Sequence, residues 1–172
     1  KWAKNLGVKK VYILNDQELY GKGIADVFEA TAKKIGLPVV ANEGIDWKQP
    51  DQKPVLTKIR ASGADLVYLG GVIETGAQVI IRQMKEVGLV APRTRFMGPD
   101  GLLEEELLKG ATCDAALGTE MRVTFAGLPF EKMRGVGAKT YETYKAKYGK
   151  EPTSYALYAA EEGVDDGSLA ER

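Results

Sequence analysis

Several acidic residues of this chain follow apolar runs, where a side chain is free to meet a ligand. Asp16 directly follows "VYILN", and Asp100 lies between a proline and a glycine in "PDG", after the apolar run "RFMG". Tyr20 precedes the glycine-containing stretch "GKG". A carboxylate in such a place could bind a positively charged group, transfer a proton or ligate a cation. Alternatively, Asp100 is a turn residue that caps the helix after it.

The residue types exclude several other chemistries. The 172-residue chain contains no histidine, so Ser-His and Cys-His nucleophiles and histidine metal ligands are excluded. Its only cysteine, Cys113, excludes an internal disulfide and a thiolate metal cluster, and we interpret it as a small buried apolar residue. Lys and Arg number 24, as do Asp and Glu, and the basic residues are scattered, so we predict no nucleic-acid partner.

Cofactor and metal sites find little support in the spacing of these residues. The stretch "YGKG" lacks the glycine pattern of a dinucleotide or P-loop site, so no phosphate-bearing cofactor is predicted. Four aspartates could gather a hard cation, but they lie on separate loops without calcium-loop spacing, and we predict no metal: Asp16, Asp46, Asp51 and Asp100. Asp16 and Asp100 could also form a glycosidase pair, although nothing in the sequence indicates a raised pKa for either.

Hydrophobic periodicity predicts the elements that position these residues. Near-continuous apolar runs predict strands over 11–16, 39–45, 65–71, 94–98 and 116–125. Helical spacing predicts helices between them over 24–35, 53–63, 75–87 and 102–110, with Thr75 as the N-cap of the third. Alternation of strands and helices with short connections predicts a three-layer α/β/α sandwich with a mainly parallel sheet. No apolar stretch approaches the roughly 18 residues of a membrane-spanning helix.

The end of the chain follows a different pattern. One predicted helix carries Tyr141, Tyr144 and Tyr148, a second carries Tyr155 and Tyr158, and no strand follows either. We interpret the tyrosines as packing residues and the two helices as part of an unfinished unit. In the predicted parallel sheet, ligands bind beyond the carboxyl ends of the strands, where the loops with Asp16, Tyr20 and Asp100 lie.

The quoted segments, taken together, resemble the branched-chain amino-acid binding proteins of ABC transporters, which are type I periplasmic binding proteins. The resemblance is carried by "VYILNDQELYGKGIADVFEATAKKIGLPVV", "LTKIRASGADLVYLGG", "RQMKEVGL" and "FMGPDG", in the right order and spacing from residue 1 to about residue 160. It implies two α/β lobes joined by a hinge, with the ligand in the cleft between them. Residues 1–121 would then be the second lobe, and 122–172 a hinge crossing and helical return segment of a first lobe that is otherwise absent.

The resemblance also implies the ligand-binding residues. Tyr20 in "LYGKG" matches a cleft aromatic residue that packs against the ligand, and Asp100 in "GPDG" matches the acid that receives the α-ammonium of an amino acid. After Gly71 the family often has tyrosines, whereas this chain has Val72 and Ile73, followed by Glu74. We therefore expect Gly71, Val72 and Glu74 to contribute to a site for an aliphatic amino acid, with a different amide, an aromatic acid or a small peptide-like solute left open.

The implied function is binding rather than catalysis. A member of this family delivers its solute to an ABC transporter membrane permease from the periplasm or the cell surface, where it can be a lipoprotein. The alternatives are a flavodoxin-like enzyme or receiver domain and an extracellular sensory domain of the same superfamily. The strand "DLVYLGG" has no aspartate at its carboxyl end, which disfavours a receiver. We also expect the fragment to self-associate through 122–160, where the absent lobe would expose apolar surface.

Overall fold

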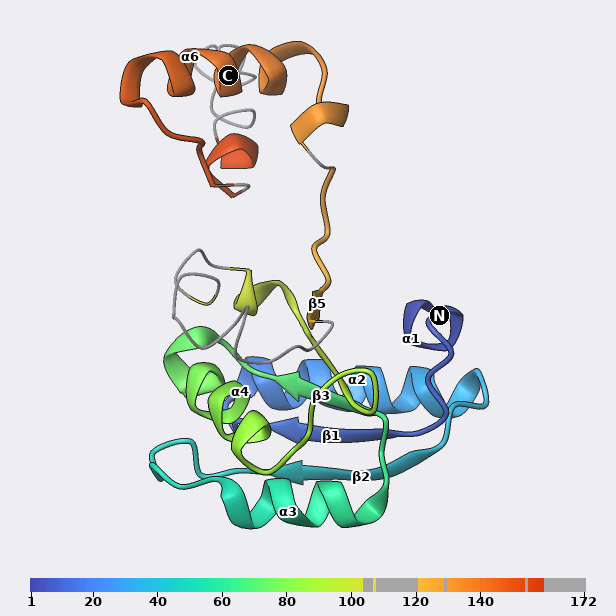
Figure 1. Ribbon diagram of the computed structural model, residues 1–172. Helices are drawn as coiled ribbons and strands as arrows, with labels where there is room; N and C mark the ends of the chain where they lie inside the picture. Colours follow the sequence, from blue (N-terminus) through green and yellow to red (C-terminus); the bar gives the residue numbers. More distant parts are fainter. Residues whose placement is uncertain (104–106, 108–120, 129, 154, 160–172) are drawn as a thin grey trace. The chain divides into compact units, whose positions relative to one another are not determined.

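The computed structural model describes residues 1–103, 107, 121–128, 130–153 and 155–159 (Figure 1). They divide into two compact units, Lys1–Phe125 and Ala126–Arg172. Cys113, most of the helix predicted over 102–110, and residues 116–120 of the last predicted strand lie outside the described residues. Within those residues, no helix combines the length and apolar character that crossing a membrane requires.

The first unit alternates strands and helices along the chain. Its strands are β1 (Val11–Asn15), β2 (Val39–Gly44), β3 (Leu66–Gly70), β4 (Arg95–Gly98) and β5 (Met121–Val123). Its helices are α1 (Trp2–Asn5), α2 (Leu19–Lys34), α3 (Lys53–Ser62) and α4 (Ala77–Glu86), with 3-10 turns η1 (Ile73–Thr75) and η2 (Asp100–Leu102). Where the predicted elements fall on described residues, most of their ends agree within a residue or two, because long apolar runs and helical stripes leave few alternatives. The helix predicted over 24–35 begins earlier, at Leu19.

All the strand pairs are parallel, and the strand order is β2-β1-β3-β4-β5. In the pairing of β1 with β3, Asn15 lies opposite Gly70, so both strands end at the same level. Parallel strands place their carboxyl ends on one edge of the sheet. The segments after β1, β3 and β4 consequently emerge side by side on that edge, as the doubly wound prediction requires.

Each face of the sheet has its own apolar core, and successive strand residues alternate between the two. In β1, Tyr12 and Leu14 join the core with α3 and α4, whereas Val11 and Ile13 join the core with α1 and α2. Every residue of β1 and β3 is buried, while the edge strand β2 is partly exposed. Cover on both faces explains why the central strands read as continuous apolar runs rather than as alternating ones.

Glycines end the helices at the points that the sequence predicts. Gly63 is the C-cap of α3 with a φ of 66°, and Gly36 follows the C-cap of α2 with a φ of 69°. A left-handed residue at this place satisfies the last carbonyl groups of a helix, and glycine adopts that conformation without a steric penalty. Gly36 therefore ends α2 before β2, and Gly63 ends α3 before β3.

The second unit contains η3 (Phe130–Lys132), α6 (Gly135–Tyr148) and a helical segment over 155–159. The backbone N–H of Leu128 donates to the hydroxyl of Tyr158 at 2.6 Å, and the hydroxyl of Tyr141 donates to Glu151 Oε1 at 2.7 Å. The Tyr144 and Tyr148 rings lie 4.6 Å apart in a tilted arrangement. The predicted packing role of the tyrosines is thus partly met inside the unit, although the Tyr148 side chain is 54% exposed.

Candidate functional site

The carboxyl edge of the sheet brings Tyr20 and Asp100 together. Tyr20 lies in the first turn of α2 and Asp100 is the first residue of η2. The Tyr20 hydroxyl donates a hydrogen bond of 2.6 Å to Asp100 Oδ1. Burial of the phenol, together with this bond and the negative charge of Asp100, raises the pKa of Tyr20 to about 12. Tyr20 therefore remains a neutral donor to the carboxylate at physiological pH.

Asp100 is the first residue of η2 rather than its N-cap, and the helix predicted to follow it over 102–110 lies mostly outside the described residues. The N-cap of η2 is Pro99, and its side chain forms no cap bond, as expected for proline. Asp100 is partly buried, and its Oδ1 accepts from Tyr20 in the first turn of α2. The carboxylate thus joins the start of α2 to the segment after β4.

Gly71, Val72 and Gly101 pack closely beside this hydrogen bond. A Cβ atom at Gly101 would lie 2.8 Å from Val72 Cγ1, 3.1 Å from the Gly71 carbonyl oxygen and 3.2 Å from Tyr20 Cε1. Only a residue without a side chain fits there, because Cβ contacts below 3.0 Å are not tolerated. Four of the five residues expected at a ligand site (Tyr20, Gly71, Val72 and Asp100) are therefore gathered around Gly101.

Glu74 is not part of this group of contacts. It lies exposed in η1, and within the described part of the chain it forms no hydrogen bond or ion pair. The other loop acids are occupied locally: Asp46 accepts from the N–H of Lys48, and Asp51 accepts from the N–H of Lys53. Across the described residues, no three acidic or cysteine side chains are grouped as a cation site would need.

Asp16 lies deeper in the same edge of the sheet and is almost fully buried, at 2% exposure. Its Oδ2 accepts a hydrogen bond of 2.7 Å from the Thr75 hydroxyl, and its Oδ1 accepts one of 3.0 Å from the N–H of Glu18. The prediction that Thr75 caps α4 is wrong, because Gly76 is the N-cap and the Thr75 hydroxyl turns inward to Asp16. The sequence predicts that Asp16 lies in the loop after the first strand, but it does not predict that this side chain is buried.

Tyr68 of β3 lies in the sheet near Tyr20 and Asp100. Its ring stacks on Phe28 of α2, with centroids 3.8 Å apart and an interplanar angle of 19°. Burial raises the pKa of Tyr68, and nearby Tyr20 and Asp100 raise it further. An aromatic pair therefore supports the sheet close to the exposed contact of Tyr20 with Asp100.

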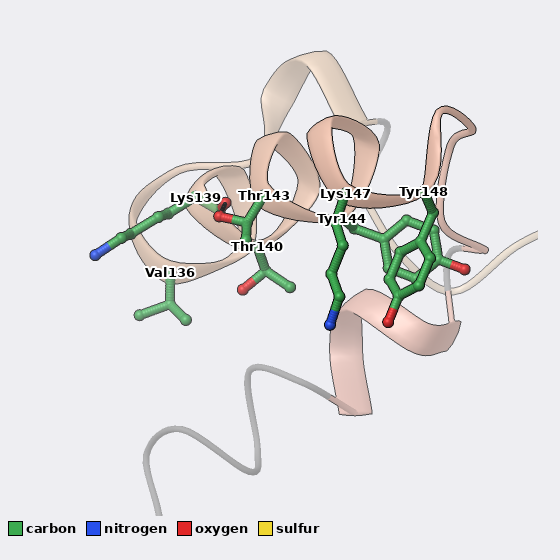
Figure 2. Close-up of a pocket in the computed structure, with 7 residues that line it drawn as sticks. All are labelled: Val136, Lys139, Thr140, Thr143, Tyr144, Lys147 and Tyr148. Atoms are coloured by element: carbon green, nitrogen blue, oxygen red, sulfur yellow. Dashed lines mark hydrogen bonds between the residues drawn. The ribbon is translucent and has the colours of Figure 1, made fainter.

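Three hollows of the described structure do not include Tyr20 or Asp100. A groove of about 270 Å³ along α2 is lined mainly by apolar residues of α1, α2, β3 and β4. A polar hollow at the end of β1 and β2 includes Asn15, Gln17 and Asn42, with the Asn15 amide donating to Asn42 Oδ1 at 3.0 Å. The third lies in the second unit, on one face of α6, where Figure 2 shows lysine, threonine and tyrosine side chains. It has no acidic side chain among its seven residues.

The arrangement at the carboxyl edge is suited to recognition rather than to bond making. It presents a carboxylate with a fixed orientation, a half-exposed aromatic ring, an aliphatic side chain and two glycines that allow close backbone approach. A carboxylate can accept charge-assisted hydrogen bonds from an ammonium group, and the ring and Val72 can contact apolar atoms. No nucleophile paired with a base is among these residues.

Comparison with known proteins gives one consistent answer. Residues 1–164 match the family model described as periplasmic binding protein. An amino acid binding protein of Pseudomonas aeruginosa is 37% identical over 154 residues, which is 90% of this chain and 39% of the relative. Other curated relatives include the Leu/Ile/Val-binding protein BraC3 of Rhizobium johnstonii and a leucine-, isoleucine-, valine-, threonine-, and alanine-binding protein of Pseudomonas aeruginosa.

Solved structures agree with the sequence matches. The leucine binding protein LivK of Thermotoga maritima has a TM-score of 0.75 and 25% identity over 91% of this chain and 44% of its own. The branched-chain amino acid transporter substrate binding protein LivJ of Streptococcus pneumoniae, solved with isoleucine, has a TM-score of 0.71 and 26% identity over 87% of this chain and 41% of its own. The chain thus spans less than half the length of these relatives.

Proposed function

Because the chain belongs to the periplasmic binding protein family, we propose that it forms part of the solute-binding component of an ABC uptake system for an aliphatic amino acid. The ligand would lie at the carboxyl edge of the sheet, with its α-ammonium on Asp100 and its side chain against Tyr20 and Val72. Gly71 would allow close approach of the ligand to the backbone, and Glu74 would line the outer rim. Function is binding, as in the relatives, and requires no cofactor or metal.

The observation that carries this proposal is the hydrogen bond between Tyr20 and Asp100. The phenol holds one carboxylate oxygen and so orients the carboxylate toward the first turn of α2. A preorganised acceptor loses less freedom when an ammonium binds, so more of the interaction appears as affinity. Family membership independently favours a binding protein over a flavodoxin-like enzyme or a receiver domain.

A second part of the proposal concerns the division of the chain. Residues 1–121 would form the second lobe of a two-lobe binding protein, and residues 122–172 a hinge crossing and a helical return segment of the first lobe. Contacts of the ligand with both lobes would then select a closed state, which the membrane permease recognises. The compact unit over Lys1–Phe125 supports a lobe that ends near this point. The site would face the periplasm or the outside of the cell, on a free or lipid-anchored protein.

The proposed ligand class is tested on the proposed two-lobe protein, called here the intact protein. Isothermal titration measures its binding of L-leucine, L-isoleucine, L-valine and acetate. An amino acid should bind, whereas acetate, which lacks the ammonium group, should not. Asp100→Asn keeps the shape and removes the charge, so it should weaken binding about a hundredfold. Asp51→Asn is the matched control, since this exposed carboxylate accepts from the N–H of Lys53 and is not among the proposed ligand contacts. The affinity of this variant should equal that of the wild type.

A further inference from the structure

Asp16 is a buried carboxylate without a role in the ligand contacts proposed above. It follows β1 at the carboxyl edge, is only 2% exposed and packs closely against two glycines. A Cβ atom at Gly21 would lie 2.0 Å from Asp16 Oδ1, and one at Gly71 would lie 3.0 Å from Asp16 Oδ2. A charged group is costly to bury unless hydrogen bonds compensate, so a buried carboxylate this tightly enclosed has a specific function in the structure.

The two oxygens of Asp16 hold two different loops. Oδ1 accepts from the N–H of Glu18, the N-cap of α2, and so fixes the turn that leads to Tyr20. Oδ2 accepts from the Thr75 hydroxyl at 2.7 Å. The same Thr75 oxygen accepts from the N–H of Val72 at 3.2 Å, which ties the backbone of the loop after β3 to the carboxylate.

The structure assigns to Asp16 and Thr75 the role of positioning residues, which hold the backbone of Gly71 and Val72 against Tyr20 so that the amino-acid site is formed before the ligand binds. This inference rests on the proposed function. Gly71, Val72 and Tyr20 all lie close to Gly101, since a Cβ atom added there would be within 3.2 Å of each of them. A shift of the Val72 backbone would therefore change the packing around Gly101, next to the Tyr20 ring and the carboxylate that Tyr20 orients.

Thr75→Val is the main test, because valine keeps the branched shape and removes the hydroxyl. In the intact protein it should weaken L-leucine binding about tenfold, whereas Thr75→Ser, which keeps the hydroxyl, should bind nearly as the wild type does. Asp16→Asn should weaken binding further, since its single oxygen cannot replace both carboxylate contacts. Because Asp16→Asn could unfold the protein, the decisive comparison is between Thr75→Val and Thr75→Ser.

Ser62→Ala is the matched control for a structural hydroxyl. The Ser62 hydroxyl donates to the carbonyl of Ile59 at 2.6 Å and accepts from the N–H of Ala64 at 3.2 Å, at the end of α3. It should lower stability without changing affinity. Equal affinities for Thr75→Val and the wild type would overturn the inference, and so would an equal loss of affinity in Ser62→Ala.

A second measurement keeps the inference testable if the proposed function fails. If the wild type binds no amino acid, the pKa of Tyr20 reports its contact with Asp100, and it should fall toward its ordinary value in Thr75→Val but not in Thr75→Ser. A Tyr20 pKa that is the same in wild type and Thr75→Val would then overturn the positioning role. Binding by the wild type together with an unchanged affinity in the variant would refute the positioning role while leaving the proposed function intact.

Discussion

The Tyr20 hydroxyl donates a 2.6 Å hydrogen bond to Asp100 Oδ1, although the two residues are 80 positions apart in the sequence. The bond joins the segment after β1 to the segment after β4. β3 lies between those strands in the sheet, and its own loop, at Gly71 and Val72, packs against the same place through Gly101. Three segments thus lie close together around Gly101, next to the carboxylate of Asp100.

Tyr20→Phe removes the donor and keeps the ring. Asp100 then loses the bond that orients it, so affinity of the intact protein for L-leucine should fall about three- to tenfold, the range of one hydrogen bond. Stability should change little, since the Tyr20 side chain is 42% exposed. Isothermal titration and chemical denaturation measure the two quantities. Tyr148→Phe, at an exposed tyrosine of the second unit, should leave affinity unchanged, and a wild-type affinity in Tyr20→Phe would contradict the proposed orientation.

The Tyr20 phenol should ionise later than ordinary tyrosines as pH rises. Its pKa is raised from 10.0 to about 12, because burial and Asp100 disfavour the phenolate. The folded state therefore retains a proton that the unfolded state releases, so this contribution to stability is complete below pH 10 and disappears as pH rises through 12. The absorbance difference between the wild type and Tyr20→Phe should show one phenol titrating near pH 12. If the phenol that the variant lacks titrates near pH 10 in the wild type, Tyr20 does not form this hydrogen bond in solution.

The fold could be predicted from the sequence because its signals are local and repeated. The runs that became β1 and β3 are buried on both faces, and glycines such as Gly63 end the helices where the apolar stripe ends. The positions of Tyr20 and Asp100 at the carboxyl edge also followed from topology, since both come directly after strands. The family resemblance implied that each of them contacts the ligand, but neither the resemblance nor the spacing predicted the hydrogen bond between them.

The inner part of the site could not be predicted in the same way. Thr75 before a helical stripe is typical of an N-cap, whose side-chain oxygen accepts from a backbone N–H of the helix. Here that oxygen accepts from the N–H of Val72 instead, and the hydroxyl donates to Asp16. The burial of Asp16 depends on the close approach of α2 to β3, which no local pattern reveals. The glycines Gly21 and Gly71 were the available signal, since both lie where a side chain would meet the carboxylate.

Gly101→Ala should damage ligand binding through crowding. The added Cβ atom would lie 2.8 Å from Val72 Cγ1 and 3.1 Å from the Gly71 carbonyl, so the loop after β3 or η2 must move. We expect at least a tenfold loss of affinity for L-leucine in the intact protein, from the order of magnitude of a small-to-large change in a packed region. Gly23→Ala is the control, because nothing lies within 4 Å of the added atom. In α2 it should raise stability by about 0.5–1 kcal/mol without changing affinity.

The isolated 172-residue chain should bind L-leucine much more weakly than the intact protein. If the ligand is enclosed by two lobes, one lobe supplies only part of the contacts, and the α-carboxylate of the ligand lacks its partners. Titration of both proteins under the same conditions measures the difference. Micromolar or tighter binding by the isolated chain would contradict the two-lobe proposal.

Sedimentation of the isolated chain over a range of concentrations should also show self-association that the intact protein lacks.

Phe28→Ala should lower stability without a specific loss of recognition. Phe28 stacks on Tyr68 at 3.8 Å and packs against the core between α2 and the sheet. Since the side chain is only partly buried, the loss should be about 2 kcal/mol, below the range for a fully buried phenylalanine. Val27→Ala is the matched control one position earlier, where the side chain is 66% exposed and the change should be small. Chemical denaturation measures the free energy of unfolding of both variants. If Phe28→Ala lowers it no more than Val27→Ala does, the aromatic stack contributes little to stability. Affinity measured on the folded fraction should stay at the wild-type value in Phe28→Ala, because the stacked pair supports the sheet and the ligand contacts belong to the loops above it.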